Sequence, residues 1–236
     1  MQRSLFSQIQ RILLDSLNFS LKNLQQIVTL CLPFILSVLV FDSLLVKATQ
    51  LPLAVAIVGQ VTIESIVYSI YMGAMIQLMA RRAGNERPQN SDLILAAIQQ
   101  LAPFLSLRMI ELFLIVFGLQ LMILPAIWLI VRLAFAEFHL VLFKVTPWEA
   151  VKRSFMDTRT HFWLVFTLFV VISLPALMIL ALVIGPDPET ALSNNSLRIG
   201  MYILASFIEL FVRISLFRTF MQVVKEQPPS SGPHYE

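Results

Sequence analysis

The stretch 127–143, "IWLIVRLAFAEFHLVLF", is apolar enough for a lipid environment apart from three side chains. These are the guanidinium of Arg132, the carboxylate of Glu137 and the imidazole of His139. Such groups can relay protons, hold ions or form ion pairs, and a charge at the bilayer centre costs about 2.5 to 3.5 kcal/mol even on lenient scales. Their partners therefore decide whether the chain only resides in a bilayer or acts there.

The same question applies to other charged residues in apolar stretches. Arg108 and Glu111 are spaced i, i+3, and Glu209 and Arg213 are spaced i, i+4, so each pair shares a helix face and is predicted to form an ion pair. Gln60 and Glu64 are also spaced i, i+4, so Gln60 is predicted to form a hydrogen bond with Glu64. The predicted intramembrane polar network comprises Asp42, Glu64, Arg108, Glu111, Arg132, Glu137, His139, Glu209 and Arg213.

Arg132 and Glu137 cannot pair within one helix. Five residues turn a helix by about 500°, which leaves the two side chains roughly 140° apart. His139 lies on nearly the same face as Arg132, and the small Ala136 between them lets another helix approach. We expect this helix to be central to a bundle, with Arg132 sharing an acidic partner on a neighbouring helix.

Three interpretations of these charges stay open. They can be paired contacts between helices, or Asp42, Glu64, Arg132, Glu137 and His139 can line a hydrated path for an ion, a proton or a lipid headgroup. Alternatively, Glu137 and His139 lie near the inner boundary of the membrane and extend to the interface.

Signals of catalysis are weak or absent. The glycines form no phosphate-binding cluster, the chain contains neither "HExxH" nor a paired "CxxC", and the three histidines lack metal-ligand spacing. Cys31 is the only cysteine and lies in an apolar run. We expect no catalytic residue, no cofactor and no metal site.

The composition indicates the elements that must position the charges. Apolar residues make up 58% of the chain and charged residues 13%, against about 25% charged residues in soluble domains. The apolar runs are long enough to cross a hydrocarbon core of about 30 Å, which takes roughly 20 helical residues. The predicted fold is an all-α membrane bundle over 26–224, with six spans at 26–46, 52–79, 103–123, 125–143, 162–184 and 197–221.

Two further helices are predicted outside the spans. Residues 1–25 place Leu5, Ile9, Ile12, Leu13 and Leu17 at helical spacing, which is typical of an interfacial amphipathic helix. The "TPWE" motif begins a second helix, over 147–160. There Thr146 is the N-cap, Pro147 is the first helical residue and Glu149 can bond back to the cap. We expect this helix on the inner surface with Trp148 near the headgroups, and a disordered tail over 225–236.

The loops predict the orientation. Twelve Lys and Arg residues flank the spans on one side, whereas only Lys47 and Arg198 lie on the other. Because cytoplasmic loops are enriched in basic residues, both termini are predicted to be cytoplasmic. The net charge of +3 is accounted for in this way, and no basic patch interleaved with exposed aromatics indicates nucleic-acid binding.

The order of these features resembles the YciC-type family of bacterial inner-membrane proteins. The resemblance rests on "NFSLKNLQQIVTL", on "PAIWLIVRLAFAEFHLVLFKVTPWEAVKRSFMDTRTHFWLVF" and on "LFRTFMQVV", and it covers nearly the whole chain. The fourth span followed by "PWEAVKRSF" also resembles the membrane domain of certain glycerophosphodiester phosphodiesterases. Their chemistry belongs to a separate soluble domain that we do not expect here, so the resemblance implies a bacterial inner membrane and a six-helix bundle but no catalytic residue.

The sequence as a whole predicts a multi-pass inner-membrane protein that is not an enzyme. Its expected role is structural, in assembly or in envelope maintenance, through lateral contacts in the membrane. Its expected partners are the lipid bilayer and, beyond it, other inner-membrane proteins or phospholipid headgroups. The alternative is a small transporter or channel subunit that uses the intramembrane charges, which would need a water-accessible polar cavity near the midplane.

Overall fold

The computed structural model describes residues 5–47, 53–184 and 195–226, and within these ranges the chain forms helices and no strand. Some side chains inside the helices, Asp42 among them, lie outside the described residues. The helices are α1 (Leu5–Lys22), α2 (Leu24–Lys47), α3 (Leu53–Ala83), α4 (Asn90–Gln99), α5 (Leu101–Leu121), α6 (Ile123–Leu133), α7 (Ala136–Phe143), α8 (Pro147–Ile184) and α10 (Asn195–Glu226).

Four helical segments are long and apolar enough to cross a membrane. They are Val58–Ala83, Leu101–Leu121, Ile123–Phe143 and Pro147–Leu174, in α3, in α5, in α6 with α7, and in α8. The protein is therefore an all-helical chain with membrane-span-like helices. The remaining two predicted spans, at 26–46 and 197–221, correspond to α2 and α10, whose side chains are described only in part.

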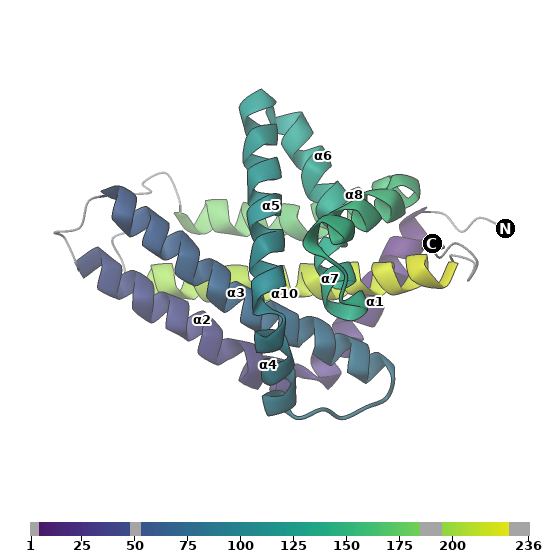
Figure 1. Cartoon of the computed structure of the whole chain (residues 1–236), viewed down its shortest axis with the longest axis horizontal. Coiled ribbons are helices and arrows are strands. Elements are labelled where there is room, and N and C mark those ends of the chain that lie inside the picture. The colour runs from purple at the N-terminus through teal and green to yellow at the C-terminus, as the bar shows by residue number, and fades with distance from the viewer. Residues whose placement is uncertain (1–4, 48–52, 185–194, 227–236) are drawn as a thin grey trace.

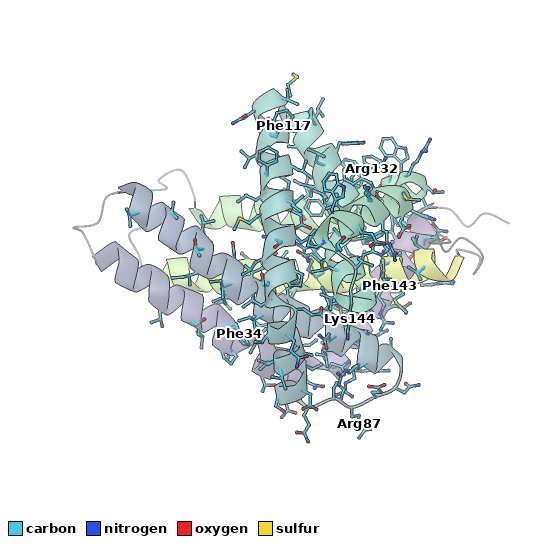
Figure 2. The ribbon with its side chains drawn as sticks, viewed as in Figure 1. Phe34, Arg87, Phe117, Arg132, Phe143 and Lys144 are labelled. Carbon is cyan, nitrogen blue, oxygen red and sulfur yellow. The ribbon has the colours of Figure 1, made fainter. Side chains whose placement is uncertain are left out.

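The helices do not all run in one direction. In Figure 1, α2, α3 and α10 extend along the length of the molecule, whereas α5 and α6 form a hairpin that stands across them. Phe117 lies near the free end of this hairpin in Figure 2, and Phe113, Leu121 and Leu124 beside it are also exposed. The hairpin thus presents apolar side chains that need a lipid or protein environment.

A small residue allows α5 and α6 to pack closely against each other. A Cβ added to Gly118 of α5 would lie 2.8 Å from Leu129 Cδ1 and 3.0 Å from Ala126 Cα. The first distance is shorter than real Cβ contacts and the second is unusually short, so glycine permits the approach of α6. The chain reverses at Met122, which is extended, and Pro125 falls in the first turn of α6, where its missing N–H costs no helical bond.

The predicted span at 125–143 is interrupted, which corrects its expected form as one helix. α6 ends at Leu133 and α7 begins at Ala136. Phe135 N–H donates to Ser154 Oγ at 3.1 Å, and Ser154 Oγ donates to Arg132 O at 2.6 Å. One serine of α8 thus satisfies a donor and an acceptor of the broken helix, because backbone groups in an apolar interior need partners.

The "TPWE" motif starts α8 as predicted. Thr146 Oγ1 accepts the Glu149 N–H at 3.3 Å, which is an N-cap bond. The helix continues to Ile184, with non-helical angles at His161 (φ −109°, ψ 19°), where the sequence separates the segments 147–160 and 162–184. Ser154 and Thr158 are fully buried beside α6 and α7. The location of this segment at a membrane surface stays a prediction.

The α1 helix packs against the protein with part of its apolar stripe. Ile9 and Ile12 are buried, and α1 contacts α10. These two isoleucines of the predicted apolar stripe are covered by protein, and the interfacial position of α1 stays a prediction. Leu5 and Leu17 of the same stripe are exposed, and so are Leu14 and Leu21. Ile9 and Ile12 of α1 thus belong to the same buried core as the other helices.

Aromatic side chains of α7 and α10 occupy the centre of the core. The ring centroids of Phe138 and Phe217 are 5.7 Å apart, and those of Phe138 and Phe220 are 5.4 Å apart. Phe135 lies 5.5 Å from Phe220 in an edge-to-face arrangement. This packing fixes α7 against α10 and thereby places Glu137, the neighbour of Phe138, among other helices.

Candidate functional site

The most buried charged side chain among the described residues is Glu137 of α7, whose exposed fraction is 1%. Tyr68 OH of α3 donates to Glu137 Oε1 at 3.0 Å. Arg213 Nη1 of α10 lies 3.1 Å from Glu137 Oε2, and Arg108 Nη1 of α5 lies 3.6 Å from Glu137 Oε1. Groups from three other helices thus converge on one carboxylate.

Two further carboxylates extend this group. Arg108 Nη1 lies 3.2 Å from Glu111 Oε2, and Arg213 Nη2 lies 3.9 Å from Glu209 Oε1. Both predicted intrahelical pairs are therefore confirmed. The order Glu111, Arg108, Glu137, Arg213, Glu209 alternates in charge, and we call these five residues with Tyr68 the Glu137 cluster.

The Glu137 cluster is held by aromatic contacts as well as charge. The guanidinium carbon of Arg108 is 4.3 Å from the centroid of the Tyr68 ring, and that of Arg213 is 5.9 Å from it. Both distances fall in the range of cation–π attraction. Because an unpaired buried charge is expensive, mutual neutralisation is what lets these side chains occupy an apolar interior.

The charge balance of the cluster is uneven. Three carboxylates face two guanidiniums, and the side chain of Glu209 is 45% exposed while that of Glu137 is 1% exposed. Glu209 also has the longest ion-pair distance of the cluster. Glu209 is thus the most exposed and most loosely paired member of the Glu137 cluster.

Arg132 does not use the acidic partner that the sequence predicts. Its Nη1 donates to the backbone oxygen of Phe155 at 2.9 Å, and its guanidinium carbon is 5.1 Å from the Trp128 ring centroid. Among the described residues no carboxylate lies within ion-pair distance of this guanidinium. The physical reason is the break after α6, which directs Arg132 toward α8 and away from the Glu137 cluster.

His139 forms a second buried polar contact. Its Nε2 lies 2.7 Å from Asp157 Oδ2 of α8, and both side chains are buried. Glu137 and His139 are both enclosed by protein, so neither side chain extends outward from the bundle. The broken helix also separates His139 from Arg132, which were expected on one face.

Of the remaining predicted residues, Glu64 pairs outside the Glu137 cluster. Gln60 Nε2 donates to Glu64 Oε1 at 2.9 Å, as the i, i+4 spacing predicts. Glu64 lies one helical turn before Tyr68 on α3. Asp42 lies outside the described residues, so its side chain is not placed. The structure thus brings together five of the nine predicted residues.

Sequence reasoning missed Tyr68, Ser154, Asp157 and Thr158. The last three occupy positions i, i+3 and i+4 of one helix, and this spacing marks a polar face that must find a partner. Thr158 Oγ1 donates to Ser154 O at 2.6 Å, which continues the same polar seam. Tyr68 had a weaker signal, as a phenol one turn after Glu64 in an apolar stretch.

A cavity of about 490 Å³ adjoins the Glu137 cluster between α5, α6, α8 and α10. Arg108, Glu111, Glu209 and Arg213 lie at its wall. The rest of the lining is almost entirely apolar: Ile115, Ile130, Val131, Leu133, Ala134, Val165, Phe169, Ser173, Met201, Leu204, Ala205, Ile208, Val212 and Leu216. Such a space fits an apolar chain better than a column of water.

The described part of the chain contains no group of three or more His, Cys, Asp or Glu side chains that could hold a metal ion. Cys31 is a buried free thiol. No protein-family model, curated protein or solved structure matches the chain. The function must therefore be inferred from the geometry.

Proposed function

We propose that this chain is a six-span membrane protein of the bacterial inner membrane that is not an enzyme and acts through lateral contacts with lipid and other membrane proteins. Such a role is structural, in assembly or in envelope maintenance. In this proposal α2 and α10 complete the set of spans, and both termini are cytoplasmic. The four membrane-span-like segments and the apolar α5–α6 hairpin support it.

The observation that carries the proposal is the pairing within the Glu137 cluster. A conduction path would need charged groups that face water, whereas Glu137 is enclosed by Tyr68, Arg108 and Arg213. The adjoining cavity is walled mainly by aliphatic side chains, so a lipid acyl chain is its best occupant. The charges then serve to hold α3, α5, α7 and α10 together beside that space.

Lipid contact can be tested with a phospholipid that carries a photoactivatable acyl chain. In native membranes we expect crosslinks to peptides that line the cavity on α8 and α10. Ala205→Trp, which fills the cavity, should reduce these crosslinks, whereas Leu119→Trp, which introduces the same side chain on the exposed hairpin, should not. Equal labelling of both variants would contradict lipid entry. Protein crosslinking in the same membranes would identify neighbours of known function.

One observation favours the alternative role as a transporter or channel subunit. Glu209 is half-exposed at the cavity wall and is only loosely held by Arg213. In a Cys31→Ala background, Ser173→Cys places a thiol in the cavity lining. A membrane-impermeant charged thiol reagent should leave it unmodified if the cavity holds lipid. Rapid modification would show a water-filled path and would favour the role of a transporter or channel subunit.

A further inference from the structure

A second hollow, of about 760 Å³, lies away from the Glu137 cluster and has the opposite character. It is formed by the end of α1, by the end of α3 with the turn that follows, and by α10. Four basic side chains line it, Lys22, Arg82, Arg87 and Arg218, with the acids Asp15 and Glu86. We call it the basic pocket. Its charged lining carries a surplus of two positive charges.

The basic side chains of this pocket are not paired with acids as Arg108 and Arg213 are. Within the described part of the chain, Lys22, Arg82, Arg87 and Arg218 take part in no ion pair with an acid. Arg82 donates from Nη2 to Gln26 Oε1, while its buried Nε–H has no acceptor among the described residues. Arg218 is fixed instead by the Phe19 ring, 5.0 Å from its guanidinium carbon. These side chains therefore keep hydrogen-bond donors available for an anion.

The turn after α3 is built to hold one side of the pocket. Glu86 N–H donates to Arg81 O at 2.9 Å and Asn85 N–H donates to Arg82 O at 3.1 Å. Asn85 is left-handed, with φ of 62°, which completes a Schellman cap. The cap satisfies the last carbonyls of α3 and sets Arg87 beside Arg82. In Figure 2, Arg87 lies at the opposite end of the view from Phe117.

The position of the pocket on α1 relates it to a membrane surface. Leu14, Leu17 and Leu21 form the exposed apolar side of α1. Lys22 follows Leu21 by one residue, which places it about 100° further round the helix. A helix with these leucines in the acyl region holds Lys22 at the level of lipid phosphates. The pocket then opens at headgroup height on the side where basic residues concentrate.

We propose that the basic pocket binds the phosphate group of an anionic phospholipid headgroup. Guanidinium and ammonium groups that converge from three chain segments suit a phosphate, because each makes charge-assisted hydrogen bonds to its oxygens. The carboxylates of Asp15 and Glu86 can accept hydrogen bonds from hydroxyl groups of a headgroup such as glycerol. This inference rests on the proposed placement of the chain in a membrane, and it adds a specific lipid class to it.

The test uses the full chain purified in detergent, with lipid binding measured by native mass spectrometry. The double variant Arg82→Gln with Arg218→Gln removes two pocket cations. The matched control, Arg81→Gln with Lys144→Gln, removes two basic residues from the same predicted side outside the pocket lining. We expect phosphatidylglycerol to bind the parent and the control at least about tenfold more tightly than the pocket variant. Phosphatidylcholine should show no such difference.

Two further arms keep the test decisive. The side chain of Arg87 is exposed, so Arg87→Gln should weaken phosphatidylglycerol binding while the melting temperature stays at the parent value. Glycerol phosphate, a soluble phosphate monoester without acyl chains, should compete poorly. Strong competition by it would overturn the lipid assignment in favour of a soluble phosphate ligand. Equal phosphatidylglycerol binding by both double variants would overturn the inference alone, whereas the acyl-chain crosslinking tests the proposed function separately.

Discussion

Glu137 of α7 and Arg213 of α10 form an ion pair of 3.1 Å in which the carboxylate is 1% exposed and the guanidinium side chain is 18% exposed. The two residues are far apart in the sequence, and neither is the partner that local spacing assigns to the other. Their contact links the broken segment α6–α7 to the last helix. It also makes Glu137 the shared acid of Arg108 and Arg213.

The first prediction compares two acids that pair with Arg213. Glu137→Gln should lower the free energy of unfolding by about 3 to 5 kcal/mol, because it removes the buried acid that Arg108 and Arg213 share. Glu209→Gln should cost about 1 kcal/mol or less, since Glu209 is half-exposed and 3.9 Å from Arg213. Denaturant titration in detergent measures both. A larger loss for Glu209→Gln would mean that the intrahelical pair is the dominant one.

The second prediction concerns the break between α6 and α7. Ser154→Ala removes the acceptor of Phe135 N–H and the donor to Arg132 O, and should cost about 1 to 3 kcal/mol because both groups stay buried. Ser106→Ala is the control, since that hydroxyl bonds only Ala102 O at an exposed position. It should change the unfolding free energy by about 0.5 kcal/mol or less. Equal stability of the two variants would show that the break does not depend on α8.

The third prediction tests the close approach of α5 and α6. Gly118→Ala should destabilise the protein by about 1 to 3 kcal/mol, because the added methyl group meets Leu129 and Ala126. Gly59→Ala is the control, since a Cβ there meets nothing within 4 Å. That change should be neutral or stabilising by up to about 1 kcal/mol, owing to the higher helix propensity of alanine. Melting temperatures of both variants provide the measurement.

The sequence predicts those features that depend on neighbouring residues. The N-cap at Thr146, the ion pairs at i, i+3 and i, i+4, and the separation of two helical segments near His161 are all local. The break at Ala134–Phe135 is not local: it contains no glycine or proline, and its backbone groups are satisfied by Ser154, 19 residues from Phe135. The local apolar pattern therefore predicts one continuous helix, because the serine that satisfies the break lies far away in the sequence.

The candidate site was predictable in its residue types and less so in its pairing. Charges in apolar stretches must find partners, so Arg108, Glu111, Glu209 and Arg213 could be named from the sequence. The sharing of Glu137 could not, because Tyr68 lies 69 residues from it and only the packing of α3, α5, α7 and α10 brings them together. For the same reason Arg132 was assigned an acid, whereas its partner is a backbone oxygen of α8.

The fourth prediction concerns topology. Reporter fusions that are active only outside should be active after Lys47 and Pro186 and inactive at Glu236, because basic residues concentrate on the other side of the spans. A fusion at Gln120 tests the α5–α6 hairpin, which stands across α2, α3 and α10 in Figure 1. If the chain has six spans, the fusion at Gln120 should be active outside. An outer location of Glu236 would contradict the orientation.

The central claim is that the Glu137 cluster is a structural set of paired charges, and a double-mutant cycle on Glu137 and Arg213 tests it most directly. Unfolding free energies in detergent are compared for the parent, Glu137→Gln, Arg213→Gln and the double variant. We predict a coupling energy between about 1 and 3 kcal/mol, with the double variant more stable than additivity requires, because it strands fewer charges. Additivity of the two single changes within about 0.5 kcal/mol would contradict the account.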